Sequence, residues 1–172
     1  MAEMMSRTRP MCLVDPESQY DPAAFRAEEF DVGDLAGIWT RLRTGGNVYL
    51  RPVEERPAPP GAGKLEAPWD LLSCVPDLTV AVDEVQRFIG QQYCPPGFRQ
   101  IMQGGRKLDQ SVILATQQPQ HIPDAVSDQA TAVYIFRLQA KAKKYVEREW
   151  ALEAPALPRY EWIRYSDDDD DE

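Results

Sequence analysis

The sequence predicts an α/β protein built on a mostly parallel sheet with helices on both faces. Three short runs carry the prediction: LTVAV at 78–82, SVILAT at 111–116 and TAVYIF at 131–136. Each run lacks the alternation of a strand that faces water on one side, which is typical of strands buried on both faces. Helix-forming segments separate the runs, and strands that alternate with helices favour a parallel sheet.

The first half of the chain is punctuated by proline. Asp15-Pro16 ends an apolar run, because proline cannot continue a central strand. Asp21-Pro22 is typical of a helix N-cap followed by a first-turn proline. From Asp34 onward, apolar side chains recur at helical spacing and form one stripe. We therefore expect strands over 11–14 and 48–50, helices over 22–30 and 34–44, and a proline-rich loop over 52–63.

In the second half of the chain, expected helices alternate with the three apolar runs. Trp69 and Leu72 are expected to face inward from the first of these helices, and YCPPG at 93–97 breaks the chain. Gly104-Gly105 is a typical helix end. We expect helices over 65–74, 98–104 and 139–150, with a last edge strand near 160–163.

The net charge of −9 is concentrated at one end of the sequence. Six consecutive acidic residues occupy 167–172, and the rest of the chain holds 19 basic and 22 acidic residues. A block of like charges is typical of a solvated tail, so we expect a core over 1–165 and an acidic disordered tail over 166–172. The nearly neutral core argues neither for nor against nucleic acid.

Cysteine and histidine offer little material for chemistry. Cys12, Cys74 and Cys94 are widely spaced and lack a CxxC pair, as in a cytoplasmic protein with reduced thiols. His121 is the only histidine, and we expect it in a loop. A zinc site and a nucleophile–histidine pair are therefore not expected. No apolar run reaches 18 residues, so we expect no membrane segment.

Two adjacent acids follow the 78–82 strand directly. In an open α/β sheet, ligands bind beyond the carboxyl ends of the strands, where Asp83 and Glu84 fall. An apolar strand ending in Asp-Glu is the Walker B pattern of nucleotide hydrolases, in which the first acid holds Mg²⁺ through water. The same two residues also fit a helix N-cap and a first-turn acid.

A polar amide follows the next strand. Gln117 comes directly after SVILAT, again at a carboxyl end, where a neutral amide can contact a γ-phosphate or orient a water. The series of strand, Asp-Glu, about 30 residues, strand and Thr-Gln is more specific than either half. Gly104-Gly105-Arg106 lies between the two strands.

With these motifs the chain resembles the HerA–FtsK superfamily of RecA-like P-loop ATPases, which includes DNA translocases and phage zonula occludens toxin-like members. The resemblance covers roughly residues 1–165. It implies that Asp83 binds Mg²⁺ and ATP, that Glu84 is the general base and that Gln117 is the sensor. Many relatives carry arginine where this chain has Gln118, which leaves that arginine's inter-subunit role without a residue here. The matching segments are CLVDPESQY at 12–20, VYLRP at 48–52, VAVDEVQRF at 80–88, GGRKLDQSVILATQQP at 104–119 and AVYIFRL at 132–138.

The phosphate-binding loop of such an ATPase, GxxxxGK(S/T), is not matched in the sequence. PPGAGKL at 59–65 comes nearest, but it has Ala58 where the first glycine belongs and Leu65 where the Mg²⁺-binding hydroxyl belongs. The resemblance aligns 11–14 with the strand that follows the phosphate loop. We therefore expect the sheet to lack its phosphate-loop strand, leaving a gap or a free edge beside SVILAT.

Three explanations for this pattern are open: a fragment or misplaced start, a degenerate relative, or a loop supplied by a partner chain. The expected function is that of the C-terminal portion of an ATP-driven DNA translocase or packaging-type ATPase, inactive on its own. A non-catalytic interaction protein with the same fold is the alternative. Double-stranded DNA and a homo-oligomeric ring are the implied partners of the complete protein.

Two groups of basic residues have open roles. Arg106 is either an arginine finger for a neighbouring catalytic site or a structural cation at a helix end. A basic group on the 139–150 helix either faces DNA or is a solvated helix face. That group is Lys141, Lys143 and Lys144.

Overall fold

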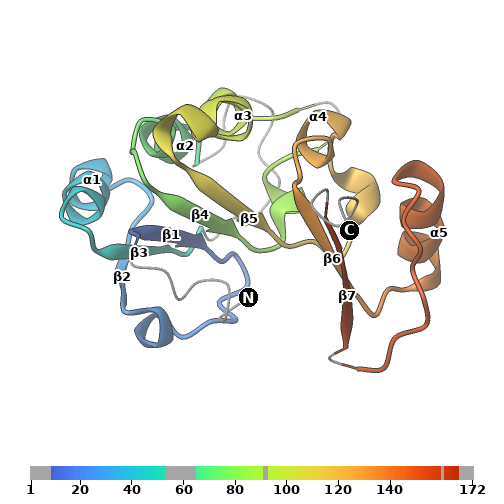
Figure 1. Ribbon diagram of the computed structural model, residues 1–172. Helices are drawn as coiled ribbons and strands as arrows, with labels where there is room; N and C mark the ends of the chain where they lie inside the picture. The colour runs from blue at the N-terminus through green and yellow to red at the C-terminus, as the bar shows by residue number, and fades with distance from the viewer. Residues whose placement is uncertain (1–8, 53–64, 91–92, 160, 167–172) are drawn as a thin grey trace.

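The computed structural model describes residues 9–52, 65–90, 93–159 and 161–166. Five strands form one all-parallel sheet in the order β2-β3-β1-β4-β5, and two further strands form a separate antiparallel pair (Figure 1). The predicted α/β fold with a parallel sheet is confirmed. The strands are β1 (Met11–Val14), β2 (Ala27–Phe30), β3 (Asn47–Leu50), β4 (Thr79–Val82), β5 (Ser111–Leu114), β6 (Ala132–Phe136) and β7 (Trp162–Ser166).

Side-chain alternation along the strands divides the large sheet into two faces. On one face, alternate strand residues such as Val14 and Val80 pack against helices and form the main core, with Trp69 and Phe98 among its largest members. On the other face, Leu13 and its neighbours form a smaller cluster. The α-helices are α1 (Leu35–Arg43), α2 (Glu66–Leu72), α3 (Pro96–Gly104), α4 (Asp124–Ser127) and α5 (Ala140–Glu149). The 3₁₀ helices are η2 (Pro22–Phe25), η3 (Val85–Arg87), η4 (Gly105–Leu108) and η5 (Pro119–His121).

The predicted helix over 22–30 is wrong in its second half. Asp21 caps η2 by accepting a hydrogen bond from the Ala23 N–H, as the Asp-Pro pattern predicts. Arg26 then adopts φ +52°, in the left-handed region, which ends the helix after one turn. The following four residues join the edge of β3 as the parallel strand β2. Strand pairing therefore overrides the helix propensity of the Ala-Glu-Glu stretch.

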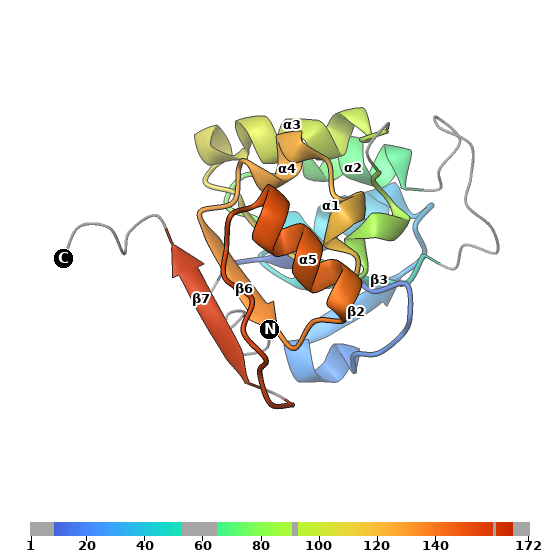
Figure 2. The same cartoon turned by 90° about the vertical axis from the view of Figure 1, so that its right-hand side faces the viewer.

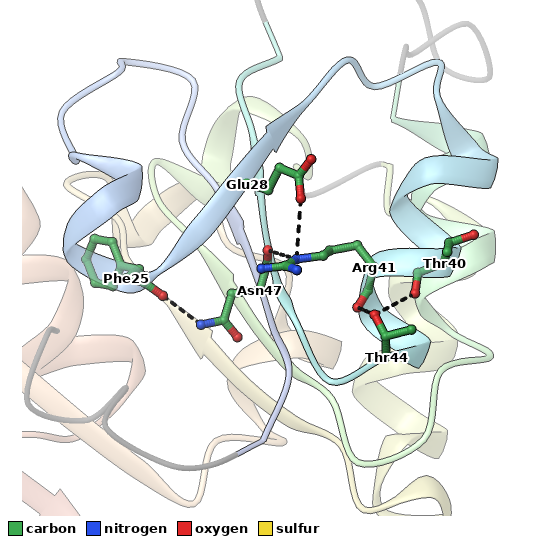
Figure 3. Close-up of polar contacts among 6 residues, drawn as sticks. All are labelled: Phe25, Glu28, Thr40, Arg41, Thr44 and Asn47. Carbon is green, nitrogen blue, oxygen red and sulfur yellow. Dashed lines mark hydrogen bonds and ion pairs between the residues drawn. The ribbon is translucent and has the colours of Figure 1, made fainter.

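Side-chain contacts fasten β2 and η2 to the rest of the sheet (Figure 3). Asn47 donates from Nδ2 to the Phe25 carbonyl at 2.6 Å, and Arg41 on α1 lies 3.6 Å from the Glu28 carboxylate. The Arg41 Nε also donates to the Asn47 carbonyl at 3.5 Å. One asparagine and one arginine thus connect four elements: η2, β2, α1 and β3.

The TAVYIF run forms β6, but β6 is not a strand of the large sheet. It pairs with β7 alone, and α5 covers one face of the pair (Figure 2). Ile135, Val146 and Ala154 form a small core on that face. On the opposite face Phe136 and Trp162 sit side by side in the register, with 50% and 54% of their surfaces exposed.

Strand β5 is the last strand of the five-stranded sheet that the described residues form, and the predicted lack of a phosphate-loop strand stays a prediction. Its four residues are all half-buried, whereas Val80, Ala81 and Val82 of β4 are fully buried. Strands β4 and β5 are adjacent, so in the described residues they do not flank a third strand between them.

Some sequence-based predictions fall outside the described residues. These include residues 59–64 of the rejected phosphate-loop candidate and residues 167–172 of the acidic tail; Ser166, placed in that tail, ends β7. Within the part of the chain that the structure describes, no helix has the length and apolarity needed to cross a membrane.

Candidate functional site

The two strand ends that carry the predicted site residues lie side by side. In the parallel register Val82 of β4 is opposite Leu114 of β5, so the segments that follow both strands leave the sheet at the same end, the carboxyl end. Glu84 comes two residues after β4, and Gln117 three residues after β5. The Gln117 Nε2 donates to Glu84 Oε1 at 2.5 Å. The structure thus brings together the two residues that the sequence placed at neighbouring strand ends.

Glu84 is tightly held for a polar side chain. The residue is 8% exposed, and its backbone adopts φ +47°, a left-handed conformation that is costly for a residue with a Cβ. Gln86 donates to the other carboxylate oxygen, Oε2. Thr116 in turn donates its hydroxyl to Gln86 Oε1 at 2.6 Å, and the Val85 N–H donates to the Ala115 carbonyl. Gln86 and Thr116 were not predicted as site residues, because no known spacing distinguishes them from other loop residues.

Asp83 is buried beside Glu84 and lies within reach of a tyrosine from another strand end. Its Oδ1 accepts the Glu84 N–H at 2.9 Å, and the Tyr20 hydroxyl hydrogen-bonds to its carboxylate. Burial raises the pKa of Asp83, and the negative charges of Glu84 and Asp15 add to the increase. Burial, with the Asp83 charge second, raises the pKa of Tyr20 to about 12, so this phenol stays a donor at neutral pH.

Asp15 is a third buried acid at the carboxyl end of the sheet. It follows β1, which pairs with β4, and its carboxylate accepts the N–H groups of Glu17 and Tyr20 at 3.1 and 3.0 Å. The Tyr49 hydroxyl donates to it at 2.7 Å. In the sequence, Asp15-Pro16 indicated only a strand end and a motif match. Its satisfied hydrogen bonds give Asp15 a structural role in shaping the loop that delivers Tyr20.

The possible metal ligands at the carboxyl end of the sheet fit a hard cation better than a soft one. Its charged groups are the carboxylates of Asp15, Asp83 and Glu84, and Mg²⁺ prefers oxygen ligands and keeps most of its water. Across residues 9–52, 65–90, 93–159 and 161–166, no cluster of three or more His, Cys, Asp or Glu side chains is arranged to hold a metal ion. A cation here would therefore have fewer than three such side chains as direct ligands and would depend on water or phosphate oxygens for the others.

The other predicted site residue lies elsewhere. Arg106 is exposed in η4, which precedes β5, and the Leu108 carbonyl in the same turn accepts the Asp77 N–H just before β4. Both positions belong to the amino ends of these strands, so Arg106 lies at the opposite end of the sheet from Glu84. Its role as an arginine finger for a neighbouring site stays a prediction.

The remaining polar candidates are spread over the surface. His121 is exposed in η5, and Lys141 and Lys144 are exposed on α5, while Lys143 lies 3.6 Å from Glu147. The three cysteines are free thiols. Burial raises the pKa of Cys12, in the centre of the sheet, to about 12, which makes it inert as a nucleophile.

Acids and an amide converge here at the carboxyl ends of adjacent parallel strands, which is where open α/β sheets bind their ligands. Comparison with solved structures places this chain beside genome packaging NTPase B204 from Sulfolobus turreted icosahedral virus 2. The complex of that protein with AMP matches with a TM-score of 0.70 at 14% identity, over 94% of this chain and 79% of that chain. Its complex with ATP-gammaS gives 0.69 at 15% identity, over 92% and 77%.

The DNA-packaging ATPase B204 from Sulfolobus Turreted Icosahedral Virus matches with a TM-score of 0.68 at 16% identity, over 94% of this chain and 79% of that chain. No family model and no curated protein matches the sequence. At these identities the likeness shows the fold, so this chain has the fold of genome-packaging NTPases. The resemblance that the sequence motifs indicated is confirmed at that level.

Proposed function

We propose that this chain is the Walker B and sensor portion of an ATP-driven DNA-packaging or translocating ATPase. The observation that carries the proposal is the contact between Glu84 and Gln117 across the carboxyl ends of adjacent parallel strands. Supporting it, the structural neighbours are described as genome packaging NTPases, and two of them are complexes with AMP and ATP-gammaS. Duplex DNA as the translocated polymer and a homo-oligomeric ring belong to the same proposal.

In this proposal each polar residue at the strand ends has one role. Asp83 would hold Mg²⁺ through a water, and such an ion would supply positive charge beside the phosphates. Glu84 orients and deprotonates the attacking water, and Gln117 turns its amide to the γ-phosphate. Tyr20 keeps the Asp83 carboxylate in place through its hydroxyl. Burial and two neighbouring acids raise the pKa of Asp83. A bound cation would lower this pKa again, because it favours the ionised carboxylate.

We infer that the phosphate-binding loop comes from a strand that pairs with the outer edge of β5. The sequence lacks GxxxxGK(S/T), and the four residues of β5 are half-buried although they form a continuous apolar strand. A parallel strand on this edge would cover them and deliver its loop to the carboxyl ends beside Glu84 and Gln117. Without it, the chain should bind Mg–ATP weakly at best and should not hydrolyse it.

The test compares the chain alone with the chain joined to a strand–GxxxxGK(S/T)–helix segment, supplied as a fusion or as a second polypeptide. Isothermal titration with Mg–ATP should show binding only in the joined form, and Glu84→Gln should abolish hydrolysis while binding is kept. Val112→Pro is the matched control, since it blocks the outer edge of β5. Binding in the joined form that survives Val112→Pro would contradict the pairing. Glu84-dependent hydrolysis by the chain alone would contradict the need for an added loop.

A non-catalytic interaction protein is the second candidate. It is favoured by the exposed aromatic side chains of Phe136 and Trp162 on the outer face of β6–β7. A thermal melt separates the two candidates. A soluble monomer with a single cooperative transition in the absence of nucleotide would support a self-sufficient module, whereas a joined form that melts at a higher temperature with Mg–ATP supports the ATPase.

A further inference from the structure

Both carboxylate oxygens of Glu84 accept hydrogen bonds from side-chain amides. Gln117 donates to Oε1 and Gln86 donates to Oε2, and the glutamate is 8% exposed. A general base must present an oxygen within hydrogen-bond reach of the proton that it takes. The positions of these two amides therefore decide whether Glu84 can act on a water, and in which direction its oxygens point.

The amide of Gln86 has its orientation set by Thr116. The backbone N–H of Gln118 donates to the Thr116 Oγ1 at 2.9 Å, which leaves the hydroxyl proton to donate elsewhere. That proton goes to the Gln86 Oε1, 2.6 Å away. Because the Gln86 oxygen is the acceptor there, its NH₂ group faces Glu84. We call the series from the Gln118 N–H through Thr116 and Gln86 to Glu84 the amide relay.

The two amides on Glu84 differ in how they are supported. Gln117 is exposed and its amide donates to Oε1, so a turn of this side chain toward a ligand would break that bond and none of the bonds of the relay. Gln86 is half-buried and is tied at its far end to Thr116. The loops that carry the two amides are also joined by the backbone bond from the Val85 N–H to the Ala115 carbonyl, at 3.0 Å. Gln86 can therefore keep its hold on Oε2 when Gln117 releases Oε1.

We propose that Gln86, oriented by Thr116, is a positioning residue that aims Glu84 by holding Oε2 while Oε1 is released to water. The inference rests on the proposed function, because aiming Glu84 matters for a reaction only if Glu84 activates a water. In the resting arrangement each carboxylate oxygen accepts one amide hydrogen bond, which lowers its basicity. When Gln117 turns toward a γ-phosphate, Oε1 loses its amide donor and becomes the more basic oxygen, and the relay keeps the carboxylate from following the sensor.

The relay itself is tested in the 172-residue chain without nucleotide, by NMR of the glutamine side-chain amides. Thr116→Val removes the hydroxyl at nearly constant volume, and Thr116→Ser keeps it. We expect the Gln86 NH₂ resonances to move toward those of an exposed glutamine in Thr116→Val and to stay in place in Thr116→Ser. Gln118→Ala keeps the backbone N–H and should leave them unchanged. Gln86 resonances that ignore Thr116→Val would overturn the relay.

The positioning role is tested in the joined form that hydrolyses ATP. We expect Gln86→Leu to lower kcat about a hundredfold with little change in the KM for ATP, as for a misplaced catalytic group. Thr116→Val should lower kcat less, and Thr116→Ser should restore it. A Gln86→Leu variant that raises KM at unchanged kcat would refute the positioning role. A wild-type joined form without turnover would instead refute the proposed function, while the NMR series still decides whether the relay exists.

Discussion

Strands β4 and β5 are neighbours with nearly the same kind of sequence and very different surroundings. Val80, Ala81 and Val82 of β4 are completely buried between β1 and β5. All four residues of β5 are half-buried, because among the described strands β5 pairs on one side only. Their continuous apolar sequences predict the same burial for both strands. The difference shows that a strand is fully buried only when it has neighbouring strands on both edges. The continuous apolar sequence of β5 is typical of a strand that is paired on both edges.

The largest effect should come from placing proline at adjacent positions of β5. The N–H groups of Ser111 and Ala115 donate to β4-side carbonyls, so the period of two directs the Ile113 N–H to β4 and the Val112 N–H to the free edge. Ile113→Pro should cost about 3 kcal/mol because it breaks a ladder bond. Val112→Pro should cost less than about 1 kcal/mol. Urea denaturation of both variants measures this. Equal costs would mean that the outer edge of β5 is already paired.

A second pair of variants compares burial at one register position. Val80 and Val112 are opposite each other in β4 and β5 and contact the same core. Val80→Ala should lower the free energy of unfolding by about 2 kcal/mol, from lost transfer energy and a residual cavity. Val112→Ala should cost about half of that or less, since part of the side chain already faces water. The difference should shrink if a partner strand covers β5, so the pair should be measured again in the joined form.

The smallest effect concerns the pH dependence of stability at the end of β4. Burial raises the pKa of Asp83 in the folded state above its ordinary value. The folded protein therefore favours the neutral acid, and stability from this group is present at low pH and is lost as the pH rises through the folded-state pKa. Asp83→Asn should remove that loss and raise the melting temperature near neutral pH.

Asp128→Asn, at an exposed position, is the matched control and should leave the profile unchanged. Melting curves of the three proteins across pH 4–8 test the assignment. An Asp83→Asn variant that melts below the wild type at neutral pH would show that the ionised carboxylate stabilises the fold, contrary to the direction of its pKa. Mg²⁺ is omitted from these measurements, so that the buried charge is the only variable.

Local signals in the sequence were enough to locate the parallel strands and the ends where polar residues gather. The runs MCLV, LTVAV and SVILAT form strands because β-branched residues fit a pleated, buried surface. Asp83, Glu84 and Gln117 could be predicted to meet, since adjacent parallel strands have their carboxyl ends at the same end of the sheet. Asp21-Pro22 specified its cap correctly for the same local reason: the side chain and the N–H that it bonds are two residues apart.

Contacts between distant residues were decided only by the tertiary structure. The helix-favouring residues of β2 became a strand because the β3 edge was available, and β6 paired with β7 and not with β5. Gln86 joins the site through Thr116, 30 residues away, and Tyr20 reaches Asp83 from the loop after another strand. A hydrogen bond between such residues depends on how strands are ordered in space, and neither spacing nor composition along the chain encodes that order.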